Sequence, residues 1–215
     1  MEKRETEMKK AAEFIGALLG WFAVITQFIL LLSNREASVG ESIVRFFSYF
    51  TILTNTLVAL FFTIRALHLS GKYAGLFYHR GTPIALTAFI LIVGLVYQVA
   101  LRHIWEPQGL QMITDELLHT VIPLFVLVYW YVYASKQVVT LKEVTPWLLY
   151  PAIYAIYILI RGNLSGFYPY PFLNVAEVGM QNALFNILII FSIALFLMGI
   201  LVWIGKIRAA SLKNR

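Results

Sequence analysis

The stretch RFFSYFTILTN, residues 45–55, places three polar side chains inside a segment that is otherwise apolar enough to cross a lipid bilayer. Ser48, Thr51 and Asn55 follow one another at steps of three and four residues, so a continuous helix would carry them on one face. Hydrocarbon penalises a polar face without partners, so these side chains should point at other helices or at a water-filled cavity. The pattern predicts a polar site at membrane depth.

The composition indicates an integral membrane protein. Of 215 residues 60% are hydrophobic and 13% charged, and the mean hydropathy is +0.76, which leaves too little polar surface for a water-soluble globule. The net charge of +6 comes from small basic groups beside apolar runs, a pattern typical of orientation signals, so we expect no nucleic-acid partner. The chain has no cysteine and no two histidines at ligand spacing on one helix, so we predict no metal and no cofactor.

Six apolar segments predict a single all-α domain over residues 1–215, with six transmembrane helices in one bundle. The first should be a retained span, because the residues LLLSNRE at its end offer no cleavage site for a signal peptidase. Pro107 and Gly109 should keep the loop before the fourth span free of helix. The predicted spans cover residues 11–33, 43–69, 84–101, 117–134, 146–160 and 182–204.

The distribution of basic residues predicts the orientation. Thirteen of the 17 Lys and Arg residues lie at the two termini and in the second and fourth loops, and only four lie on the other side. Cytoplasmic segments carry the excess of Lys and Arg, so both termini should be cytoplasmic.

With the helices so oriented, the polar residues of the spans gather in the extracytoplasmic half of the membrane. Thr51 should lie about 12 Å, and His119 roughly 6 Å, below the outer start of their helices, so the two can meet. The inner halves are nearly all apolar. The sequence therefore predicts a polar pocket that opens outward over an apolar floor and suits an amphiphile.

Asp115 and His119 form the predicted second half of the site. A histidine inside a span is rare, and Asp115 lies one turn earlier, where its carboxylate can orient the imidazole. A structural pair would have the same sequence, and Asp115 also fits the N-cap of the fourth span. The aromatic clusters YWYVY and YPYP are interpreted as interfacial belts.

Three motifs resemble one known family. They are YFTILTNTLV at residues 49–58, LLHTVIPLFVL at 117–127 and GFYPYPFL at 166–173. In these motifs the chain resembles the androgen-induced protein and androgen-dependent TFPI-regulating protein family and its bacterial six-span relatives. Members are threonine hydrolases that cleave fatty acid esters of hydroxy fatty acids.

The resemblance implies an intramembrane lipid ester hydrolase, in a bacterial cytoplasmic membrane, with Thr51 as nucleophile and His119 as base. An alternative alignment matches residues 45–48 to the family's Lys-Phe-Leu-Thr and would make Ser48 the nucleophile. The ILTN that follows Thr51 departs from the family's usual sequence.

The implied reaction is acyl transfer to a threonine hydroxyl, in which the base takes the hydroxyl proton. Asp115 would hold the imidazole tautomer, and Asn55 or Asn186 would donate to the oxyanion. Arg161 and Asn182 at the outer rim would bind a free carboxylate of the substrate.

Two other classes of function fit part of the pattern. A non-enzymatic lipid-binding or transport protein would use the same outward-opening cavity, but would tolerate loss of the Thr51 hydroxyl. A purely structural protein would need no intramembrane histidine. The expected partners are the membrane and a lipid or fatty-acyl ester, and the sequence specifies no oligomeric state.

Overall fold

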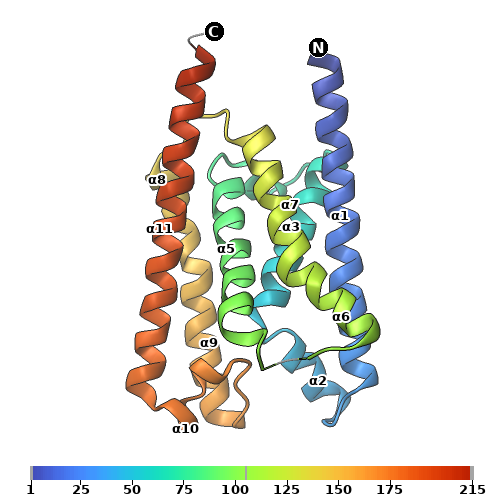
Figure 1. Ribbon diagram of the computed structural model, residues 1–215, viewed down its shortest axis with the longest axis vertical. Helices are drawn as coiled ribbons and strands as arrows, with labels where there is room; N and C mark the ends of the chain where they lie inside the picture. Colours follow the sequence, from blue (N-terminus) through green and yellow to red (C-terminus); the bar gives the residue numbers. More distant parts are fainter. Residues whose placement is uncertain (1, 105, 214–215) are drawn as a thin grey trace.

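The computed structural model describes residues 2–104 and 106–213, and all regular structure in that part of the chain is helical. The long helices run side by side, and both termini lie at the same end (Figure 1). The elements are α1 (Glu2–Ser33), α2 (Val39–Phe46), α3 (Phe50–Ala66), α4 (Ala74–Tyr78), α5 (Thr82–Val96), η1 (Tyr97–Leu101), α6 (Gly109–Glu116), η2 (Leu117–Val121), α7 (Ile122–Tyr129), η3 (Trp130–Ala134), α8 (Leu141–Val144), η4 (Thr145–Leu148), α9 (Leu149–Ser165), η5 (Pro171–Leu173), α10 (Val175–Val178) and α11 (Met180–Lys213).

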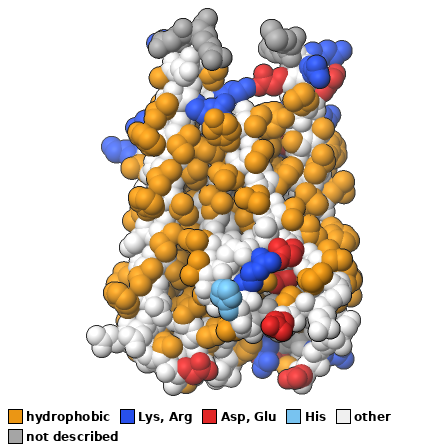
Figure 2. Space-filling model, in the orientation of Figure 1, with side chains coloured by type: hydrophobic (Ala, Val, Ile, Leu, Met, Phe, Trp, Pro, Cys, Tyr) orange, Lys and Arg blue, Asp and Glu red, His pale blue; other side chains and the backbone are white. Residues whose placement is uncertain are grey.

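Within the described residues, five continuous helices are long and apolar enough to cross a membrane, and the bent pair α2 and α3 adds a sixth if it is counted as one span. The all-helical membrane class predicted from the sequence is thereby confirmed. On the face shown in Figure 2, hydrophobic side chains cover a broad band, and charged side chains gather mostly toward the two ends. Such a band is the surface that a bilayer would cover.

The helices pack closely where small residues meet. A Cβ at Gly20 of α1 would lie only 2.8 Å from the Cβ of Ala59 on α3, so this crossing requires glycine. Helix α5 lies at the centre and contacts α3, α7 and α11. It buries most of its side chains, including Phe89 and Ile90, which have no exposed surface.

The first, fifth and sixth helices extend beyond their predicted bounds, and the second and fourth spans differ in kind from the prediction. The second was expected to run unbroken over residues 43–69, but α2 and α3 meet at 69° around Phe47 to Tyr49. The fourth was expected to begin at residue 117, but its helix begins at Gly109. Pro107 and Gly109 do not prevent a helix from beginning here. The first N–H groups of a helix have no partner within it, so a proline before the helix and a glycine at its first position interrupt no helical hydrogen bond.

The half of the bundle nearest the termini, predicted to be nearly all apolar, contains a buried charged cluster. Glu13 of α1 is only 4% exposed, and its Oε1 lies 3.2 Å from Arg65 Nε of α3. Tyr129 donates a hydrogen bond of 2.6 Å to the same oxygen. A buried carboxylate needs such partners, so this cluster ties three helices together. Tyr129 and Trp130 of the YWYVY cluster are buried, so these two side chains do not belong to the predicted interfacial belt, whereas Tyr131 of the same cluster is exposed.

Candidate active site

Thr51 lies at the beginning of α3, directly after the break in the second span. The break leaves helix-end backbone groups without intrahelical partners, and side chains satisfy them. Ser48 Oγ donates to Val44 O at 2.7 Å, and Tyr154 donates its phenolic proton to Ser48 O at 2.9 Å. The N–H of Thr51 donates to the Tyr170 hydroxyl at 3.3 Å. These contacts fix the Thr51 side chain at the positive end of a 17-residue helix.

His119 lies in the π-helical turn η2, and two features of the sequence place it there. Pro123 follows four residues later and has no N–H to give to the His119 carbonyl, so the α-helical ladder is interrupted at this point. Gly94 of α5 then lets the freed carbonyl approach, since a Cβ at Gly94 would lie 2.9 Å from His119 O. Single π-turns of this kind occur often at functional sites.

The structure brings Thr51 and His119 together. Thr51 Oγ1 lies 3.4 Å from His119 Nε2, at the long end of hydrogen-bonding distance. His119 Nδ1 lies 2.9 Å from the backbone carbonyl oxygen of Asp115. A carbonyl oxygen only accepts, so Nδ1 carries the proton and Nε2 presents its lone pair to the threonine hydroxyl. This is the tautomer that a general base requires.

Asp115 is not the N-cap of the fourth span, because its helix begins at Gly109 and the residue before it is Gln108. The Asp115 side chain is 9% exposed, and its Oδ1 lies 3.5 Å from His119 Nδ1. Its Oδ2 is buried and has no hydrogen-bond partner within the described residues. The carboxylate is thus beside the imidazole, while the shorter contact is made by the backbone of the same residue.

Tyr170 is the site residue that the sequence did not reveal. Its hydroxyl oxygen lies 3.3 Å from Thr51 Oγ1, and it also accepts a hydrogen bond from the Thr51 N–H. The ring is 7% exposed and stacks on Phe172, with centroids 5.3 Å apart. Burial raises the pKa of Tyr170 above its ordinary value, so the phenol keeps its proton. The sequence predicts that the motif YPYP belongs to an interfacial belt. The fold of the loop instead brings Tyr170 against Thr51.

The other predicted polar residues of α3 serve the structure around the site. Ser48 has no exposed surface and also contacts Tyr157 Oη at 3.2 Å, on the side of α9. Asn55 Nδ2 donates to Thr51 O at 2.9 Å and to Leu118 O at 3.3 Å, so both of its N–H groups are engaged. Asn55 therefore joins α3 to the π-turn η2 and has no proton left for an oxyanion.

Asn186, Asn182 and Arg161 lie away from the Thr51 hydroxyl. Asn186 Nδ2 donates to Phe172 O at 2.8 Å, and this bond holds the loop that carries Tyr170. Asn182 is exposed and donates to Val178 O of its own segment. Arg161 Nη2 lies 2.8 Å from Glu41 Oε1. Its guanidinium is paired with Glu41, and Arg161 does not line the cavity beside Thr51.

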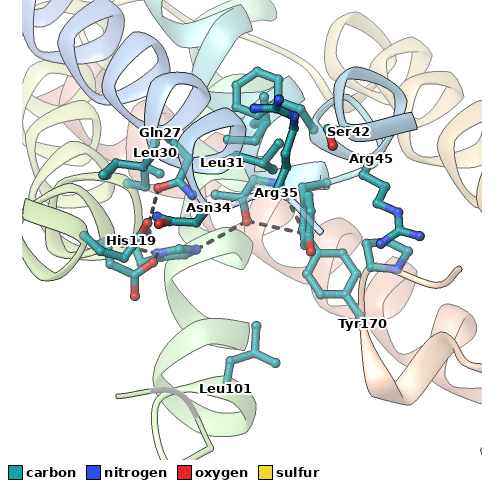
Figure 3. A pocket seen from close by; sticks show the side chains of 18 of the residues that line it. Gln27, Leu30, Leu31, Asn34, Arg35, Ser42, Arg45, Leu101, His119 and Tyr170 are labelled. Carbon is teal, nitrogen blue, oxygen red and sulfur yellow. Dashed lines mark hydrogen bonds and ion pairs between the residues drawn. The ribbon is translucent and has the colours of Figure 1, made fainter. Parts of the chain in front are cut away.

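A cavity of about 760 Å³ opens beside the Thr51 and His119 pair, at the end of the bundle opposite the termini. His119 and Tyr170 lie on opposite sides of it in Figure 3, and both contact the Thr51 hydroxyl. The cavity combines hydrocarbon with amide and charged groups, and its polar lining includes two arginines. The lining residues include Gln27, Leu30, Asn34, Arg35, Arg45, Leu101 and Gln111.

No family model, no curated protein and no solved structure matches this chain. Among the described residues no group of three His, Cys, Asp or Glu side chains could hold a metal ion.

Proposed function

We propose that the protein is an intramembrane lipid ester hydrolase with Thr51 as the nucleophile and His119 as the general base. The observation that carries the proposal is the contact of 3.4 Å between Thr51 Oγ1 and a ring nitrogen whose tautomer is fixed by a backbone carbonyl. Nucleophile, base and orienting group form the arrangement by which unreactive hydroxyls are activated. Contacts of this kind are often long before a substrate is bound.

The groups present account for each proton transfer. His119 Nε2 takes the Thr51 proton as Oγ1 bonds to the ester carbonyl carbon, and it then protonates the leaving alkoxide as the ester C–O bond breaks. Water attacks the acyl-threonine with the same base, which releases the acid and restores the hydroxyl. The predicted oxyanion donors, Asn55 and Asn186, have their amide protons on carbonyl groups. The Tyr170 hydroxyl, beside the nucleophile, takes this role in the proposal.

The substrate class follows from the surroundings of the nucleophile. Thr51 lies between polar groups and an apolar helical bundle, so a long-chain ester with one polar part fits the site. The resemblance to threonine hydrolases of fatty acid esters of hydroxy fatty acids leads to the same proposal. The excess of Lys and Arg at the end with the termini favours a site on the extracytoplasmic side, in a bacterial cytoplasmic membrane.

The test is hydrolysis of a long-chain p-nitrophenyl ester by the purified full-length chain in detergent. Thr51→Ala and His119→Ala should each lower kcat by about 10⁴-fold or more, as removal of a nucleophile or base does. Ser48→Ala is the matched control and should retain activity, because Ser48 Oγ is bonded to α2 and α9. A fluorophosphonate probe should label Thr51.

An active Thr51→Ala variant would contradict the assignment, and an inactive Ser48→Ala would support Ser48 as the nucleophile. A protein that binds the ester but turns over none, with Thr51→Ala binding it equally well, would be a lipid-binding or transport protein.

A further inference from the structure

A second cavity touches the same threonine from another side. It has a volume of about 70 Å³ and lies among α3, α5, α9, α11 and the loop that carries Tyr170. Apart from Thr51 and the tyrosines Tyr154 and Tyr170, every residue in its lining is hydrocarbon or phenyl. The others are Phe50, Ile92, Val93, Val96, Leu101, Pro151, Ala155, Phe172, Leu173, Ile187, Ile190 and Phe191.

The two cavities share three residues, Thr51, Leu101 and Tyr170. The reactive hydroxyl therefore lies at the junction of a wide, partly polar cavity and a narrow, apolar one. A substrate bound at Thr51 has to send its two halves in different directions, and the lining sorts them by polarity. An apolar half gains free energy in the narrow cavity, whereas a polar half placed there would lose its hydrogen bonds to water.

We propose that the narrow cavity binds the acyl chain of the substrate, and that the chain is a single unbranched hydrocarbon. This inference rests on the proposed function. Once the alcohol has left, the acyl half stays bonded to Thr51 Oγ1 until water releases it. The acyl half is therefore the part of the substrate that we place in the narrow, apolar cavity. The alcohol half leaves through the wide cavity of about 760 Å³. The narrow cavity of about 70 Å³ is far smaller than the wide one of about 760 Å³, so a single unbranched chain suits it better than a ring or a branched chain.

The lining also shows where a long chain would continue. Ile187, Ile190 and Phe191 come from α11 and are only partly buried, in a helix whose neighbouring residues Leu184 and Leu188 are exposed on the apolar surface. A chain longer than the cavity can therefore extend along α11 into the surrounding hydrocarbon. The site should select against short acyl groups more strongly than it limits long ones.

Ala155 of α9 gives a direct test, because it lines the narrow cavity and contributes no group to the proposed chemistry. Ala155→Phe should fill the space. For p-nitrophenyl esters, kcat/KM with octanoate and palmitate should fall at least about tenfold relative to acetate, because filling a hydrophobic pocket discriminates by chain size. Ala152→Phe on the same helix is the matched control, since Ala152 lines neither cavity. Ile190→Ala should shift the preference the opposite way, toward longer or branched acyl groups.

Two ester series separate the halves of the substrate. The p-nitrophenyl esters vary the acyl chain, and acetate esters of linear alcohols vary the leaving group. The proposal expects Ala155→Phe and Ile190→Ala to change the first profile and leave the second unchanged. A change confined to the alcohol series, or no change of either profile in both variants, would overturn it.

A binding measurement is independent of turnover. A diazirine-labelled palmitic acid should crosslink to Phe172 or Phe191 in Thr51→Ala, and Ala155→Phe added to that variant should abolish the crosslink. If the wild-type protein hydrolyses no ester and this crosslink still forms, the proposed function fails while the acyl-chain site stands. Crosslinking only outside the narrow cavity, in a protein that does hydrolyse esters, would refute the acyl-chain site alone.

Discussion

The Tyr97 ring lies flat on the His119 imidazole, with centroids 4.1 Å apart and ring planes 15° from parallel. Tyr97 begins the π-turn η1 and His119 occupies the π-turn η2, so the two irregular turns of neighbouring helices meet at this contact. The stacked ring closes one face of the imidazole and restricts its rotation. With Nδ1 held by the Asp115 carbonyl, Nε2 is left facing Thr51.

The first prediction concerns this stack. Tyr97→Leu should lower kcat by about three- to tenfold, because an aromatic pair contributes about 0.5–1.5 kcal/mol beyond area burial. Tyr97→Phe keeps the ring and should stay near the wild-type rate. The measurement is steady-state hydrolysis with thermal unfolding recorded on the same samples. Equal losses in both variants would assign the effect to the phenol hydroxyl instead of the stack.

The second prediction concerns the close approach at Gly94. Gly94→Ala should destabilise the fold by about 1–3 kcal/mol and lower kcat, because an added methyl group in a packed interior forces the backbone apart. The methyl would lie 2.9 Å from His119 O and 3.4 Å from Pro123 Cβ. Gly199→Ala in α11 is the control, since nothing lies within 4 Å of a Cβ there. A Gly94→Ala protein with wild-type unfolding and rate would show that η2 can move without consequence.

The sequence predicted the helical membrane class because that class follows from apolar length, which is a local property. It also pointed to Thr51 and His119, since polar side chains in a hydrophobic run stand out. The structure brings these two residues into contact. Their roles in a reaction stay a prediction.

The break before Thr51 escaped the sequence analysis because its cause lies elsewhere in the chain. Phe47, Ser48 and Tyr49 contain neither proline nor glycine, and the interruption is compensated by Tyr154 and Tyr170, more than 100 residues away. Such tertiary hydrogen bonds leave no periodic signal. The π-turn at His119 did have a local signal, the proline four residues later, which marks a carbonyl without its helical partner.

The substrate-binding and oxyanion residues predicted from the sequence fail for the same reason, which is that tertiary hydrogen bonds leave no pattern in the sequence. Asn55, Asn186 and Arg161 are each already bonded to protein groups. Polarity and depth can be estimated from sequence, whereas the partner of a side chain depends on the packing of other helices. Arg35 of the wide cavity, by contrast, donates to Leu32 O at the end of the preceding helix α1 and has no carboxylate partner in the described part of the chain.

The third prediction concerns Tyr170. Tyr170→Phe should lower kcat by about 10²-fold with little effect on KM, as loss of one oxyanion donor does. The fold should remain, because phenylalanine preserves the stacking on Phe172. Burial raises the pKa of Tyr170 above the ordinary 10.0, so the donor stays protonated and wild-type activity should show no alkaline loss from this group below about pH 10. An alkaline loss below that pH which disappears in Tyr170→Phe would contradict this reasoning.

The fourth prediction concerns orientation. In a chain free of other cysteines, Gln108→Cys should react with a membrane-impermeant maleimide in intact cells, and Ser70→Cys should react only after permeabilisation. Ser70 is exposed in the loop after α3 and Gln108 is exposed in the loop before α6. These two loops lie at opposite ends of the bundle, and the loop after α3 is on the side of the termini. The excess of Lys and Arg on the Ser70 side is the reason for the expected direction. Labelling of Ser70→Cys from outside would invert the protein and place the cavity at the cytoplasmic face.

The last prediction concerns Asp115, whose backbone and side chain both face His119. The Asp115 carbonyl oxygen is 2.9 Å from Nδ1 and the carboxylate oxygen 3.5 Å, so the backbone makes the hydrogen bond that fixes the tautomer. A substitution at Asp115 leaves that carbonyl in place. Where the carboxylate itself sets the tautomer, as in soluble serine-protease triads, the amide variant loses about 10⁴-fold in rate.

Asp115→Asn should therefore keep the correct tautomer and lose only the attraction between the carboxylate and the imidazolium formed during the reaction. At 3.5 Å the attraction is about 1 kcal/mol with the screening of bulk water and about 5 kcal/mol with that of a protein site, so we expect a loss of about tenfold to 10³-fold in kcat. A neutral amide also costs less to bury than a carboxylate whose Oδ2 has no partner among the described residues, so thermal unfolding should not be lowered. Measured kcat and unfolding temperature of Asp115→Asn decide the matter. A loss near 10⁴-fold in a stably folded variant would mean that the carboxylate, and not the backbone, orients His119.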